Sequence, residues 1–147
     1  MSATTPDLAA APGRGTAPHP HPGLVLSALW TTTMLVFAYV DIFGFFRADV
    51  LSAALDGEVA GVGFTVDQRF LLLTLAYVAV PSLMVVLSLV LPQRVVRPLT
   101  VVVASLYAVS IAVSCIGETW AYYVVGSAME VVLLGAAVVV AVRWRRV

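Results

Sequence analysis

Two carboxyl groups stand out in this sequence because largely apolar stretches surround them. Glu130 is the one charged residue between Ala121 and Val142, and Asp41 lies near the end of the stretch from Leu24 to Phe46. Tyrosines and serines recur in the neighbouring apolar stretches at helical spacings of three and four. Carboxyls and phenols in apolar surroundings can bind a cation or exchange a proton. The candidate ligand-binding residues are Asp41, Tyr77, Tyr107, Ser110, Tyr123 and Glu130.

The state of Glu130 depends on its neighbours. No lysine or arginine lies within the apolar stretches, so Glu130 has no cationic partner at its own depth. Its carboxyl is therefore expected to be protonated, because burial disfavours the charged form, or to face a hydrated cavity. A structural alternative is a hydrogen bond across the helices to Tyr107 or Ser110. Asp41 lies closer to water, where Arg47 or Arg69 is within reach.

A proline adds a free acceptor to the same region. Pro81 follows Tyr77 by four residues and has no N–H to donate to the Tyr77 carbonyl. That oxygen is expected to accept a hydrogen bond from a ligand, a water molecule or a neighbouring hydroxyl instead.

The elements that must position these residues are four apolar helices. The chain has 147 residues, 61% hydrophobic and 11% charged, whereas soluble domains carry roughly 25% charged residues. The predicted spans cover residues 24–46, 70–91, 98–116 and 121–142, each close to the length that crosses a bilayer core of about 30 Å. Small and polar residues form a stripe on each span; in the first they are Thr31, Met34, Ala38 and Asp41. The prediction is an all-α fold, a membrane-spanning antiparallel four-helix bundle.

The segments between the spans have their own signals. Residues 47–68 are expected to form a polar, acidic loop, ended by a capping box at Thr65 that starts the second span. Pro92 should end that span, and Pro98 should start the third. Three tryptophans are expected at the membrane interfaces near the ends of spans: Trp30, Trp120 and Trp144.

The arginines predict the orientation. All eight basic residues are arginine. Four spans place both termini on one side, and six arginines lie on that side, against two, Arg47 and Arg69, on the other. The positive-inside rule then makes both termini cytoplasmic in a bacterial inner (plasma) membrane. The six are Arg14, Arg94, Arg97, Arg143, Arg145 and Arg146.

The N-terminal residues differ from the rest of the chain. Residues 1–23 are rich in Ala, Thr and Pro and are expected to form a disordered cytoplasmic tail before a transmembrane domain at residues 24–146. The two histidines, His19 and His21, lie in this tail and make a poor metal site. No cofactor or metal is expected. With a formal net charge of zero, nucleic acid is not an expected partner.

Three groups of residues resemble a family of small bacterial four-helix membrane proteins of unknown function. They are Ala28-Leu29-Trp30 with Tyr39-Val40-Asp41, the proline-interrupted second span with Leu91-Pro92 and Arg94, and Tyr122-Tyr123 with Met129-Glu130 and Trp144. The resemblance covers about Leu26 to Arg146. It implies a fold and a membrane location, and no activity.

Two functions remain open. The first is a non-enzymatic multi-pass membrane protein whose externally open acidic and tyrosine pocket binds or moves a small cation, a proton or a lipophilic ligand. Small multidrug transporters also have four spans and a membrane-embedded glutamate, but their glutamate lies in the first span. The alternative is a structural or accessory subunit that uses its small-residue faces to bind another membrane protein or a second copy of the chain. A membrane enzyme is less favoured because no nucleophile or metal set accompanies the carboxyls.

Overall fold

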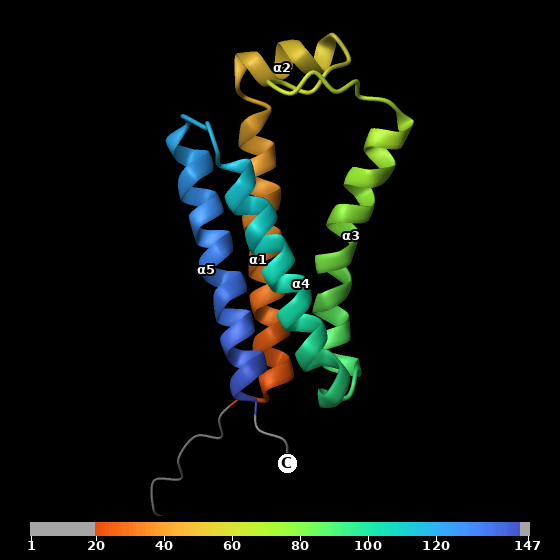
Figure 1. The fold of residues 1–147 in the computed structure, drawn as a ribbon, viewed down its shortest axis with the longest axis vertical. Coiled ribbons are helices and arrows are strands. Elements are labelled where there is room, and N and C mark those ends of the chain that lie inside the picture. The colour runs from red at the N-terminus through yellow and green to blue at the C-terminus, as the bar shows by residue number, and fades with distance from the viewer. Residues whose placement is uncertain (1–19, 145–147) are drawn as a thin grey trace, which may run out of the picture.

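The computed structural model describes residues 20–144, which form five helices. Four of them are long and apolar enough to cross a membrane. These four run alternately up and down, and the described chain ends meet at the same end of the molecule (Figure 1). The prediction of an all-α, membrane-spanning antiparallel fold is confirmed. The helices are α1 (Pro22–Gly44), α2 (Ala48–Leu55), α3 (Gln68–Val90), α4 (Gln93–Ser114) and α5 (Ala121–Arg143).

The first helix starts earlier than residue 24, where the sequence placed it. His21 caps it, with its Nδ1 accepting a hydrogen bond from the Gly23 N–H at 3.2 Å, and Pro22 takes the first position. Proline suits that position because its missing N–H has no helical partner there. The placement of His21 in a disordered tail was therefore wrong, since its ring also packs edge-on against Trp144 at 5.4 Å. The rest of the predicted tail, residues 1–19, lies outside the described residues.

Two other helix starts differ from the predictions. Asp67, not Thr65, caps α3: its carboxylate accepts a hydrogen bond from the Phe70 N–H at 2.8 Å. Pro92 ends α3 as predicted and also occupies the N-cap position of α4, so α4 begins five residues before Pro98. Pro98 lies inside α4, where its missing N–H costs the helix one hydrogen bond, the one to the Arg94 carbonyl.

A short helix, α2, occupies part of the segment that was predicted to be a loop. It lies across the end of the molecule between α1 and α3 (Figure 1). Asp49 sits in its first turn, where the helix dipole favours a carboxylate. Gly57, with φ +75°, follows the helix in the left-handed conformation that commonly ends helices. These two residues are the sequence signal that could have revealed the helix.

The long helices form an incomplete ring. α1 packs between α3 and α5, α4 packs mainly on α5, and contact between α3 and α4 is slight. The buried residues of α3 are Pro81, Met84 and Ser88, all in its second half. Its first half diverges from α4 toward the α2 end (Figure 1). The first half of α3 therefore packs little on α4.

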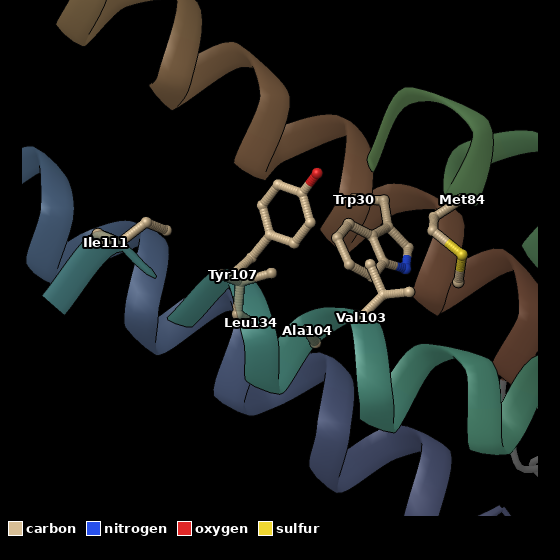
Figure 2. Close-up of a cluster of buried hydrophobic side chains, with 7 residues drawn as sticks. All are labelled: Trp30, Met84, Val103, Ala104, Tyr107, Ile111 and Leu134. Carbon is tan, nitrogen blue, oxygen red and sulfur yellow. The ribbon is translucent and has the colours of Figure 1, made fainter. Parts of the chain in front are cut away.

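The core lies nearer the terminal end, and Trp30 is at its centre. Its indole is 0% exposed and lies beside Met84 of α3 and Val103 of α4 (Figure 2). The prediction of an interfacial Trp30 was therefore wrong. Part of the predicted face of α1 was wrong as well, because Thr31 and Ala38 are exposed. The buried residues of α1 are Gly23, Leu26, Ser27, Trp30 and Thr33.

Candidate functional site

A pocket of about 260 Å³, the acidic pocket, lies between α1, α4 and α5, with Tyr77 of α3 at its side. Five of the six residues predicted from the sequence line it. The sixth, Tyr107, is not among the lining residues. Two serines that were not among those six, Ser114 and Ser127, also line it. The predicted lining residues are Asp41, Tyr77, Ser110, Tyr123 and Glu130.

Glu130 forms the buried end of the pocket. Gly126 and Ser127, one turn earlier on α5, are buried with it, and Glu130 itself is 2% exposed. Its Oε1 has no hydrogen-bond partner within residues 20–144. The alternative in which Tyr107 or Ser110 satisfies this carboxyl was wrong, because both hydroxyls bond elsewhere. A buried carboxyl oxygen without a partner is costly, so a bound group would stabilise it.

Asp41 lies at the open end of the same pocket. Its side chain is exposed, in contrast to that of Glu130. The expected contact with Arg47 is not formed, because the ion pairs of Arg47 are with Asp49 and Glu118. The lining of the pocket contains no arginine. The two carboxyls therefore make a site that is electronegative whenever either is ionised, and that runs from an exposed mouth to a buried floor.

The hydroxyl groups of the pocket bond largely to one another. Tyr77 and Ser110 share a hydrogen bond of 2.6 Å, and the Tyr123 hydroxyl donates to Ser114 at 3.0 Å. Ser110 and Ser114 bond in turn to carbonyls of their own helix, α4. These bonds hold the tyrosines along the walls. The hydroxyls are thus largely occupied, and the carboxyls are the groups left to bind a ligand.

Tyr107 stabilises the wall rather than lining it. Its hydroxyl donates to the Tyr77 carbonyl at 2.5 Å, and the two rings lie 4.6 Å apart between centroids. This is the carbonyl that Pro81 leaves without its helical partner. The prediction that a neighbouring hydroxyl could bond this oxygen is confirmed. Tyr107 thereby joins α4 to α3 where the two helices otherwise have little contact.

A cluster of polar contacts around Arg47 lies at the α2 end of the molecule. Arg47 donates to Asp49 at 2.7 Å and to Glu118 at 3.0 Å, and its guanidinium lies 4.7 Å from the centre of the Trp120 ring. It therefore links the α1–α2 corner to the α4–α5 turn. The sequence pattern did not predict this cluster, because Arg47 and Glu118 are 71 positions apart in the chain.

The same contacts shift the protonation of the cluster. The hydrogen bond to Asp49 raises the pKa of Arg47, and Arg47 lowers that of Asp49. The pKa of Glu118 is lowered first by the N–H of Trp120, which its Oε1 accepts at 3.0 Å, and also by Arg47. All three groups are therefore charged at neutral pH, and the cluster is an ionic clamp.

The described residues bring together no metal-ligand set. Within residues 20–144, no group of three or more His, Cys, Asp or Glu side chains could hold a metal ion. The candidate chemistry of the pocket is therefore that of its two carboxyls and its aromatic walls.

Comparison with known proteins gives a family. Residues 19–147 match a family described as Family of unknown function (DUF6326). This match covers all four apolar helices and confirms the resemblance to a family of unknown function. No curated protein and no solved structure matches the chain.

Proposed function

The chain belongs to DUF6326, a family of unknown function, and we propose that it is a multi-pass protein of a bacterial cell membrane that binds a small cation in the acidic pocket. The role is one of binding, without catalysis. The pocket opens toward the α2 end, and the arginine distribution favours an orientation with this end outside the cell. The ligand therefore reaches Asp41 first and Glu130 last.

The observation that carries this proposal is the unpaired Oε1 of Glu130. It is buried at the closed end of a cavity, in a helix apolar enough to lie in a membrane. Carboxyls at such depth are costly, and proteins that keep them commonly use them for ions or protons. A cation at the floor of the pocket would supply the partner that the protein itself does not provide.

The size and walls of the pocket favour a small organic cation. A volume of about 260 Å³ is below the roughly 300–1,000 Å³ of clefts that hold drug-sized ligands. The rings of Phe37, Tyr77 and Tyr123 line the pocket, and aromatic rings attract cations at their faces. A compact alkylammonium ion matches this combination of carboxyls and rings better than an extended drug.

The proposal is tested by binding of tetramethylammonium to the purified full chain in detergent. Wild-type protein should bind it, and Glu130→Gln should weaken binding by about tenfold or more, which corresponds to roughly 1.4 kcal/mol. Glu58→Gln is the matched control, because it makes the same change of group at an exposed side chain outside the pocket. Equal affinity in wild-type and Glu130→Gln proteins that unfold at similar temperatures would rule the proposal out.

An accessory role, in which the chain binds another membrane protein or a second copy, is the other candidate. The feature in its favour is α3, whose first half has no buried residue. Its exposed side chains there include Leu71, Leu72, Leu73 and Leu75. Leucines suit lipid chains as well as a partner helix, so the unpaired Glu130 favours the pocket over this alternative.

A further inference from the structure

A second cavity lies at the opposite end of the molecule from the α2 helix. It is a groove of about 370 Å³ between the first turns of α4 and the last turn of α5. Arg94 and Arg97 lie at one part of its wall, and Val101, Val102 and Val142 at another. The acidic pocket and this groove share no lining residue.

Arg97 is a fixed cation in this groove. Its Nε donates to the Ala141 carbonyl at 2.8 Å and its Nη2 to the Val142 carbonyl at 2.9 Å. These carbonyls belong to the last turn of α5, which has no helical donors for them. The two bonds use two of the five N–H groups of a guanidinium. The side chain is thus held in place and keeps donors for another acceptor.

Arg94 adds a second positive charge. It is exposed and forms no ion pair with a carboxylate in the described part of the chain. Arg97 likewise has no carboxylate partner there. Two arginines on one groove with no carboxylate partner among residues 20–144 favour an anionic ligand, and guanidinium groups bind phosphate oxygens strongly.

The apolar part of the groove lies deeper in the span than the arginines. Val101 follows Arg97 by four residues, about 6 Å along a helix. A ligand that contacts both must carry an anionic group and an apolar chain within a short distance of each other. The groove is at the end of two membrane-spanning helices, where phospholipid headgroups lie.

We propose that this groove binds one anionic phospholipid of the leaflet at the terminal end. Its phosphate bonds to Arg94 and Arg97, and the first part of an acyl chain packs on Val101, Val102 and Val142. The valines are what favour a lipid over a soluble phosphate. This inference does not depend on the function proposed for the acidic pocket.

The test compares retention of phosphatidylglycerol and phosphatidylcholine with the same acyl chains by the purified full chain, using native mass spectrometry. Wild-type protein should bind phosphatidylglycerol more tightly. Arg94→Gln should lower that affinity roughly fivefold, as expected for one arginine at a membrane surface. Arg94 is the residue to change because Arg97 also holds α5, so replacing Arg97 would affect the helix as well.

Two controls separate this site from general charge attraction and from a soluble anion. Arg69→Gln removes the same charge at the other end of the molecule and should leave the phosphatidylglycerol affinity unchanged. Val102→Phe fills the groove without changing charge and should weaken lipid binding. The proposal is overturned by equal affinity for the two lipids, by an equal loss in Arg69→Gln, or by displacement of the lipid with millimolar inorganic phosphate.

Discussion

The hydroxyl of Tyr107 donates a hydrogen bond to the carbonyl oxygen of Tyr77, across the seam between α4 and α3. Pro81 withholds the N–H that this carbonyl would receive within α3. One helix thus supplies the donor that a proline removes from its neighbour. The bond fixes Tyr77 as a wall of the acidic pocket, at a place where the packing of α3 on α4 is slight.

Replacing Tyr107 by Phe should destabilise the protein. The change leaves the Tyr77 carbonyl without a donor, and an unsatisfied buried group costs about 1–3 kcal/mol. Reversible unfolding in mixed micelles measures this loss. Tyr77→Phe is the control, because it removes a hydroxyl that is bonded to Ser110 in an exposed side chain, and it should cost less.

A double-mutant cycle makes the explanation specific. With Pro81→Ala, position 81 regains an N–H for the Tyr77 carbonyl, so the cost of Tyr107→Phe should fall in that background. An undiminished cost would mean that Tyr107 stabilises α4 by packing and that the proline has no part in it.

This bond shows what the sequence could predict. The four spans, the carbonyl freed by Pro81 and the grouping of Glu130 with Tyr123 all follow from local rules of helix length and spacing. The effect of a proline on its own helix, and the residues that share a helix face with a given position, can be read from the sequence because they depend on one helix alone. What the sequence did not state was which partner on another helix would come near.

The face of α1 shows why a local rule can fail. Thr31 was assigned to the interior because polar side chains in a membrane usually seek another helix. Its hydroxyl instead bonds to the Ser27 carbonyl of its own helix at 2.9 Å, and Thr32 bonds to Ala28 in the same way. A threonine satisfied in this manner can face outward. The large ring of Trp30 then takes the buried position.

Gly126 should tolerate no side chain. A Cβ at this position would collide with Val40 of α1, and valine is β-branched and cannot rotate freely away. Gly126→Ala is therefore expected to lose about 1–3 kcal/mol through overpacking. Gly135→Ala is the matched control on the same helix, where a Cβ meets nothing within 4 Å. It should be neutral or stabilising, because alanine favours helix. Equal stability of the two variants would contradict the close α1–α5 packing.

The ionic clamp of Arg47 should make stability depend on pH. The pKa of Glu118 is lowered in the folded protein, so its contribution is fully present above the unfolded value of about 4.3. It is lost as the pH falls through the lower folded value. Unfolding measured from pH 6 downward should therefore show a loss of stability in acid. Glu118→Gln should be less stable at pH 6 and should flatten this dependence. A profile with the same slope as wild type would mean that Glu118 is not engaged in solution.

The membrane orientation is the last prediction. Arg94, Arg97 and Arg143 lie at the terminal end, and Arg145 and Arg146 follow in the sequence, so this end should be cytoplasmic. After Cys115→Ser removes the native thiol, a cysteine at Val62 should react with an impermeant maleimide added to intact cells. Val62 suits this test because it is 60% exposed in the α2–α3 connection, whereas its neighbours Gly61 and Gly63 have positive φ angles that a side chain would strain.

The opposite end supplies the control for this labelling. A cysteine at Val95, in the first turn of α4, should react only after the cells are permeabilised. Labelling of Val95→Cys in intact cells, with Val62→Cys protected, would show that the topology is the reverse of the one predicted. The acidic pocket would then open to the cytoplasm, and the groove lined by Arg94 and Arg97 would face the outer leaflet.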